Sequence, residues 1–392
     1  MKRTKKIVFS LMGVLLLLFF VATIIIPEKL DRKFNTVTLK APYTVSKKAQ
    51  ELYNTLDFIA DMHCDALLWK RDLLKKNEQG SVDIPRMIDA NVALQAFTIV
   101  TKAPKKMNFD NNTGDTDQIT IPYILQRRPI KSWFNLTGRA IAQCNALHNF
   151  EKKSDGKFRV ITSSSELQKY LSDKKVKKEI TAGFLGIEGM HALSGKLENV
   201  DKLYDAGVRM MAPVHFFDNK LGGSAHGVSK EGLTDFGKQV IKKMQEKNMI
   251  VDVAHSSPQL LNDIFEISTK PVVSSHTGVQ GTCETVRNLS DEHLKKIAAS
   301  GGLISIAMFE PATCNSTVAS SAKAIKYCID LVGADYVALG SDFDGAIEIH
   351  TDITGLPLYV EEMLKLGISE VDIRKVMGGN VKNFMLKNLP KQ

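Results

Sequence analysis

Short apolar runs alternate with amphipathic segments through most of the chain. Eight of the apolar runs predict strands: Phe58–Asp65, Val92–Val100, Ala182–Glu188, Val208–His215, Met249–His255, Pro271–His276, Leu303–Phe309 and Tyr336–Asp342. Segments with helical periodicity fall between them, for example Leu233–Lys247, Pro258–Ile267, Asp291–Ser300 and Val318–Val332. Apolar strands that alternate with amphipathic helices are typical of a parallel sheet covered by helices. Eight such units predict an α/β fold, a (β/α)8 TIM barrel.

Two regions interrupt this pattern. The stretch from about residue 101 to residue 181 separates the second and third predicted strands, and we expect it to be a mostly helical insertion. Residues 34–56 are polar and predict a linker with a leading helix, so that the barrel itself would occupy residues 57–392. A single barrel with an insertion accommodates a chain of this length.

The N-terminus carries an apolar segment of a different kind. Ile7–Ile26 contains 20 residues without a charge, enough for a helix of about 30 Å that crosses a bilayer core. Four basic residues precede it, which favours a cytoplasmic N-terminus and a body on the extracytoplasmic (periplasmic or extracellular) side. A cleaved signal peptide, which would leave the body secreted, is the alternative. Because Pro27 follows the run directly and no small-residue cleavage site ends it, we interpret residues 1–33 as an uncleaved signal anchor.

Charge and cysteine content exclude some classes of function. Residues 1–33 hold seven basic and two acidic residues, which account for +5 of the net charge of +9. The weakly basic remainder argues against nucleic-acid binding. The five cysteines contain no CxxC pair, so no zinc ribbon is expected. An extracytoplasmic body permits disulfides, but the sequence leaves their pairing open.

Polar residues gather at the ends of the predicted strands. Six of the eight strands end on histidine, aspartate or glutamate, namely at His63 and Asp65, Glu188, His215, His255, His276 and Asp342. In an α/β barrel the carboxyl ends of the strands converge on one mouth, where active sites are built. We therefore expect these side chains to meet.

Their chemistry suits a pair of metal ions. His63 and Asp65 are two positions apart on one strand, so both can face the barrel axis and bind one metal. His255 and His276 offer two ligands for a second metal, and Glu188 lies between the pairs in strand order. Imidazole and carboxylate ligands favour zinc. A single buried histidine is as often structural, so the prediction depends on the whole set.

The motifs that contain these residues resemble those of the membrane (renal-type) dipeptidases. The matching segments are Ile59-Ala60-Asp61-Met62-His63-Cys64-Asp65, Gly186-Ile187-Glu188-Gly189, Asp252-Val253-Ala254-His255-Ser256, Ser274-Ser275-His276, Arg287-Asn288-Leu289-Ser290-Asp291, Gly340-Ser341-Asp342-Phe343-Asp344-Gly345 and Gly379-Asn380. They occur in order from about residue 57 to residue 385. The resemblance implies a zinc-dependent dipeptidase that uses a metal-activated hydroxide, with two Zn²⁺ per chain. It also implies a homodimer.

The resemblance further implies a role for each site residue. His63 and Asp65 would bind one zinc, His255 and His276 the other, and Glu188 would bridge them. Three residues would contact the substrate: His215 would stabilise the tetrahedral oxyanion, Arg287 would bind the free carboxylate, and Asp342 would meet the free amine and handle the proton. The family tolerates a D-residue at the second position. Catalysis would therefore depend on His215, Asp342 and Glu188.

Alternatives to a dipeptidase stay open at this point. The same barrel and metals could hydrolyse a lactone or a phosphoester or deaminate a substrate, and a membrane-tethered binding protein could retain an inactive barrel. Outside the motifs, we expect His226 to be a solvated loop residue, His293 to lie at the surface, and Cys64 to be a small buried residue facing the helices.

Overall fold

The computed structural model describes residues 2–315 and 317–392. Eight parallel strands form a closed barrel, because β3 pairs with β5 as well as with β2. The barrel strands are β2 (Ile59–Asp61), β3 (Val92–Val100), β5 (Thr181–Glu188), β6 (Val208–Ala212), β7 (Ile250–Asp252), β8 (Val272–Thr277), β9 (Leu303–Ile306) and β10 (Val337–Leu339). The predicted TIM barrel is confirmed.

Several strands are shorter than the sequence predicts. The expected strands ended on the site residues, but β2, β6, β7 and β10 end two to four residues before them. At two of these ends the backbone turns into the left-handed region, with φ of 62° at His255 and 66° at Asp342. This conformation takes the chain out of the hydrogen-bonded ladder, and hydrophobicity alone does not signal it.

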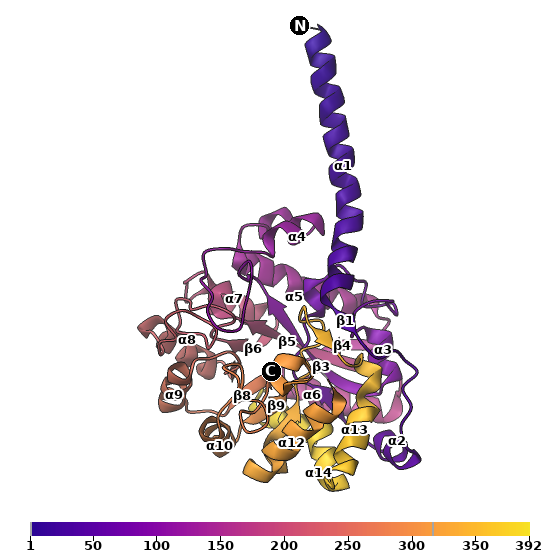
Figure 1. The fold of residues 1–392 in the computed structure, drawn as a ribbon, viewed down its shortest axis with the longest axis vertical. Coiled ribbons are helices and arrows are strands. Elements are labelled where there is room, and N and C mark those ends of the chain that lie inside the picture. Colours follow the sequence, from indigo (N-terminus) through magenta and orange to yellow (C-terminus); the bar gives the residue numbers. More distant parts are fainter. Residues whose placement is uncertain (1, 316) are drawn as a thin grey trace.

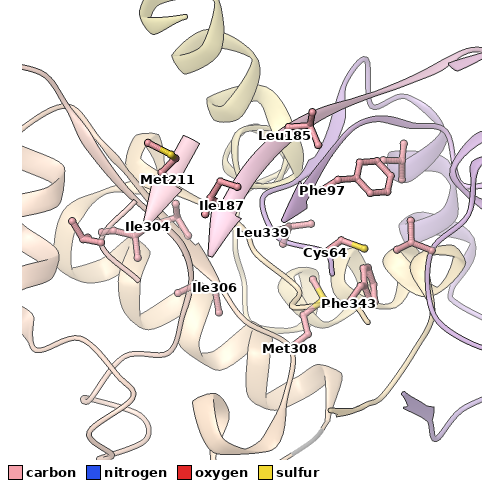
Figure 2. Close-up of a cluster of buried hydrophobic side chains, with 14 of the residues drawn as sticks. Cys64, Phe97, Leu185, Ile187, Met211, Ile304, Ile306, Met308, Leu339 and Phe343 are labelled. Atoms are coloured by element: carbon pink, nitrogen blue, oxygen red, sulfur yellow. The ribbon is translucent and has the colours of Figure 1, made fainter. Parts of the chain in front are cut away.

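Two apolar layers hold the barrel together. In β5, Phe184 faces the interior of the barrel, where it packs with residues of the other strands and of α15. Leu185 and Ile187 face the surrounding helices. Figure 2 shows this outer layer, to which β3, β6, β9 and β10 also contribute. Cys64 belongs to the outer layer and is fully buried, as expected for a small apolar residue.

Helices surround the barrel (Figure 1). They are α2 (Lys47–Asn54), α3 (Ile84–Asp89), α4 (Thr120–Leu125), α5 (Leu136–Lys153), α6 (Ser164–Val176), α7 (Asn199–Asp205), α8 (Asp235–Glu246), α9 (Pro258–Ile267), α10 (Asp291–Ala299), α11 (Glu310–Thr313), α12 (Val318–Val332), α13 (Leu356–Lys365), α14 (Glu370–Arg374) and α15 (Asn380–Asn388). Four that the sequence predicted, α8, α9, α10 and α12, begin after a serine or threonine whose side chain accepts a backbone N–H of the first turn.

The insertion between the second and third barrel strands is mostly helical, as predicted. It holds α4, a 3₁₀ turn η2 (Ile130–Ser132), α5 and α6. It also holds a short strand, β4 (Phe158–Val160), which pairs with the first residues of β5 outside the barrel ring. Three residues are too few to give a hydrophobic pattern, so the sequence did not reveal this strand.

The N-terminal helix α1 (Lys2–Phe34) continues beyond the apolar segment and docks on the body. Its first part projects alone, whereas its last turns lie against the barrel (Figure 1). Asp31 is buried and pairs with Arg71 at 3.0 Å, and Arg71 pairs with Asp344 at 2.9 Å. Residues beyond α1 are also tied down, because β1 (Thr36–Val37) pairs with β11 (Glu348–Ile349). The helix and body are thus joined by a buried ion-pair network.

Candidate active site

Glu188 lies at the centre of the predicted ligands. It is the last residue of β5, and its side chain is 3% exposed. Its Oε1 atom lies 2.9 Å from His255 Nε2, 3.3 Å from His276 Nε2 and 3.7 Å from His63 Nε2. Its Oε2 atom lies 3.4 Å from His215 Nε2. Four histidines from four different strand ends therefore meet around one carboxylate.

Asp65 and Asp342 complete the cluster on the side of His63. His63 Nε2 lies 3.7 Å from Asp65 Oδ1 and 3.8 Å from Asp342 Oδ1. Thr98 on β3 donates to Asp65 Oδ1 at 2.6 Å and so fixes the carboxylate. The structure thus brings together all of the ligand residues that the sequence predicted, at the carboxyl end of the barrel.

The donor set fits divalent cations. His255 Nε2 and His276 Nε2 face each other at 3.0 Å, and His63 Nε2 has no hydrogen-bond partner among the described residues. Ring nitrogens that converge in this way on a shared carboxylate are arranged as ligands. Three groups, His63–Glu188–His276, Glu188–His215–His255 and His63–Asp65–Asp342, each place their ligand atoms within 4.8 Å of one another.

Electrostatics favour the same interpretation. Burial lowers the pKa of His255 and His276 well below the usual value, so both rings are neutral, the form that binds metals. Burial opposes protonation of His63 too, but the Glu188 and Asp65 carboxylates outweigh it and raise its pKa well above the usual value. Burial likewise raises the pKa of Asp342 well above its usual value. The site therefore holds an excess of buried carboxylates that cations would neutralise.

Ser275 orients two of the histidines. Its hydroxyl lies 3.0 Å from His63 Nδ1 and 3.0 Å from His276 Nδ1, so each ring is held through the nitrogen that points away from Glu188. Its own N–H donates to Asp252 Oδ1. Such partners fix ring orientation around a metal. The sequence places Ser275 next to His276, but adjacency does not predict contact with His63, which is 212 residues away.

The cluster opens into a cavity of about 700 Å³. Asp65, Glu188, His215, Arg287 and Asp342 line its floor together with His255. Its walls are largely apolar, and the lining residues come from several elements: Leu30, Phe34, Trp69, Val100, Phe216 and Phe309. The volume falls within the range of small-molecule sites. Two lining residues, Leu30 and Phe34, belong to α1, which the sequence gave no reason to place here.

Arg287 lies in this cavity but on a loop rather than at a strand end. The loop between β8 and α10 holds it, and one guanidinium nitrogen donates to the carbonyl of His276 at 2.9 Å. Its Nε atom has no partner among the described residues. A disulfide between Cys283 and Cys314 ties this loop to the end of α11. The sequence permitted a disulfide but left this pairing open.

Two predictions about histidines outside the motifs are wrong. His226 is fully buried rather than solvated, because its ring stacks on Phe216 at 4.7 Å and its Nδ1 atom lies 2.8 Å from the Phe109 carbonyl. His293 is also buried, with its Nδ1 atom 2.9 Å from the Ser290 hydroxyl that caps α10. His226 lies in a glycine-rich loop and His293 in a helical segment, and neither context indicates a buried side chain in the sequence.

Comparison with known sequences decides the family. The profile of the membrane dipeptidase family (peptidase family M19) matches residues 46–387. The chain belongs to this family. The predicted family is therefore confirmed, and membership in the membrane dipeptidases supports the prediction of an enzyme that hydrolyses peptide bonds.

Two dipeptidases are among the curated relatives. The chain is 28% identical over 250 residues to dipeptidase verJ of Clonostachys rogersoniana, covering 62% of this chain and 63%, less than two thirds, of that relative. It is 26% identical over 352 residues to dipeptidase aclJ of Aspergillus oryzae, covering 82% of this chain and 76% of the relative.

A solved structure has the same fold. It is a metallo peptidase from Rhodobacter sphaeroides bound to a phosphinate mimic of the dipeptide L-Ala-D-Ala. The two chains superpose with a TM-score of 0.70 at 23% identity, over 85% of this chain and 99% of the other.

Proposed function

We propose that this protein is a zinc-dependent dipeptidase that accepts dipeptides, including those with a D-residue at the C-terminal position. The observation that carries the proposal is the meeting of four histidines around Glu188 in a cavity that also holds Arg287 and Asp342. Family membership supports the reaction class. The D-residue is supported by the L-Ala-D-Ala mimic in the Rhodobacter sphaeroides relative.

Two zinc ions would occupy the cluster. His63 and Asp65 would hold one, His255 and His276 the other, and the central Glu188 would bridge them. Zinc bound there would polarise the scissile carbonyl and lower the pKa of a bound water. The donor set supports this assignment, because neutral imidazoles and carboxylates are suitable zinc ligands.

The remaining residues would bind the substrate and move protons. Arg287 presents a partly unpartnered guanidinium to the cavity, which suits a planar contact with the C-terminal carboxylate. Asp342 would accept a hydrogen bond from the free amine and carry the proton to the leaving nitrogen. Neutral His215, beside Glu188, would stabilise the oxyanion. Recognition of both end groups would limit the substrate to two residues.

We further propose that α1 anchors the protein in a membrane, with the body on the extracytoplasmic side. We also propose that the enzyme is a homodimer. The helix has the length and apolar composition to cross a bilayer. Residues 1–33 would form the anchor and its flanks, 34–56 the linker and leading helix, and 57–392 the catalytic barrel. The Cys283–Cys314 disulfide supports an oxidising compartment.

Metal content and activity test this function on the full chain in lipid nanodiscs. We expect two zinc ions per chain and hydrolysis of L-Ala-L-Ala and L-Ala-D-Ala, both lost on chelation and restored by zinc. Zinc without dipeptidase activity would indicate a metallohydrolase for another substrate. A protein with neither would be the inactive binding protein.

Arg287→Ala tests how the substrate is recognised. Loss of a charged hydrogen bond costs about 1.5–3 kcal/mol, so kcat/KM should fall roughly 10- to 150-fold. The variant should also lose the preference for free dipeptides over C-terminal amides. Arg374 lies on α14, where its guanidinium donates to the Thr55 carbonyl. Arg374→Ala is the control and should leave kcat/KM and the preference for free dipeptides unchanged. Unchanged activity of Arg287→Ala would contradict the assignment.

A further inference from the structure

A protrusion beside α1 exposes large apolar side chains. It comprises residues 120–134, that is α4, the turn η2 and their connections, and we call it the α4–η2 protrusion. Ile121 is 62% exposed, Ile130 75% and Phe134 82%. Figure 1 shows α4 at the end of the body from which α1 emerges. Three such side chains on one short segment form an apolar surface that calls for an explanation.

The contacts of Arg127 fix the level of this protrusion along α1. The Arg127 guanidinium lies over the Phe20 ring at 4.5 Å, and its Nε donates to Thr23 Oγ1 at 2.8 Å. Both partners lie inside the uncharged run, and Phe20 comes six residues before its end at Ile26. At 1.5 Å per helical residue, the protrusion reaches about 9 Å back along the apolar segment.

That level lies inside a bilayer that α1 spans. Charged residues bracket the uncharged run, with Lys6 before it and Glu28 after it, so the run has little freedom to slide along the membrane normal. A segment beside Phe20 is then about 9 Å below the end of the run, among the first acyl carbons beneath the headgroups. Interfacial elements bury their apolar face roughly 5–10 Å into this boundary.

The composition of the protrusion suits this boundary. Residues 120–134 include Arg127, Arg128 and Lys131 but no aspartate or glutamate. Arg127 contacts α1 and Arg128 donates to the carbonyls of Leu67 and Trp69, whereas Lys131 is exposed beside Ile130. An exposed basic residue beside exposed apolar ones is attracted to anionic headgroups.

We propose that the α4–η2 protrusion inserts into the outer leaflet of the bilayer that α1 spans, so that the body is held at two points. This rests on the proposed membrane anchor and is independent of the proposed reaction. Ile119, Pro122 and Gln126, within or next to the protrusion, also line the catalytic cavity, as do Leu30 and Phe34 of α1. The proposed insertion therefore places this part of the cavity wall beside the lipid.

Nitroxide labels on single introduced cysteines test this arrangement in the full chain in anionic lipid nanodiscs. The free cysteines, Cys64, Cys144 and Cys328, are buried, so a surface cysteine is labelled selectively. Ile130→Cys reports on the protrusion. Val371→Cys is the matched control, because Val371 is 64% exposed on α14, at the end of the body opposite α1. Leu16→Cys, in the middle of the uncharged run, reports on the anchor itself.

Relative collision rates with oxygen and with a water-soluble nickel complex give the depth of each label. We expect the label at residue 130 to lie below the headgroups, at roughly 5–10 Å, and the label at residue 371 to lie in water. If the label at residue 16 is deep but the label at residue 130 is as exposed to nickel as the label at residue 371, the proposal is overturned. A water-exposed label at residue 16 overturns the anchor and the proposal together, without bearing on dipeptidase activity.

Discussion

Removal of the Cys283–Cys314 disulfide should lower both the thermal stability of the barrel and its affinity for substrate. The bond joins the loop that carries Arg287 to the end of α11. Asn288 reinforces the same junction, since its amide donates to the carbonyls of Cys283 and Ala312. The perturbation is the double substitution of Cys283 and Cys314 by alanine, which removes the covalent link and leaves these hydrogen bonds.

The size of the effect follows from the closed loop. The two cysteines are 31 residues apart, and the chain-entropy relation gives about 3.7 kcal/mol for a loop of this length at 25 °C. The 342 residues of the family match carry an unfolding entropy of about 0.7 kcal/mol/K. The midpoint of thermal unfolding should therefore fall by about 5 °C. Since the loop positions Arg287, KM for dipeptides should rise more than kcat falls.

Thermal unfolding and steady-state kinetics on the full chain in nanodiscs measure both effects. Reduction of the unsubstituted protein should reproduce them, and the same reductant should leave the double variant unchanged. If the reduced protein and the double variant keep the original midpoint and KM, the disulfide neither stabilises the body nor positions Arg287, and the reasoning is refuted.

Three further predictions concern buried side chains. Ser275→Ala should weaken zinc binding about 10- to 100-fold in a chelator competition, because two ligand histidines lose their support, while Ser274→Ala, whose hydroxyl has no partner among the described residues, should not. Arg71→Met should lower the free energy of unfolding by about 3–5 kcal/mol in urea titrations, since two buried carboxylates lose their cation, and Asp31→Asn added to it should recover part of the loss. Burial raises the pKa of Cys144 and Cys328 to about 12, so roughly one thiol in three thousand is ionised at pH 8.5, against about half for a free cysteine. Iodoacetamide at that pH should leave both unmodified in the folded protein, and mass spectrometry showing rapid labelling would contradict the burial.

The barrel could be predicted from the sequence because each strand–helix unit has its own periodic signal. The ligand set could be predicted for a related reason, since parallel strands bring their carboxyl ends to one mouth regardless of sequence distance. The ends of the strands were harder to place. Left-handed backbone at His255 and Asp342 depends on local packing rather than on hydrophobic pattern.

Features that depend on contacts between distant segments were beyond sequence reasoning. The burial of His226 depends on Phe216 and the Phe109 carbonyl, which come from separate loops. Ser275 reaches His63 only because β2 and β8 converge at the mouth of the closed barrel. Docking of α1 depends on Asp31, one of two acidic residues in a charged flank. The sequence gives no sign that Asp31 is buried, because its partner Arg71 lies 40 residues further on.

The participation of Leu30 and Phe34 in the cavity wall makes the helix α1 part of the surface that a substrate in the cavity would meet. A protease that cut between these residues and the barrel would leave a catalyst with a different pocket. The family profile begins at residue 46, so alignments confined to the shared domain omit these two side chains. Two relatives with identical barrels could then prefer different dipeptides because of the residues that precede the barrel in each of them.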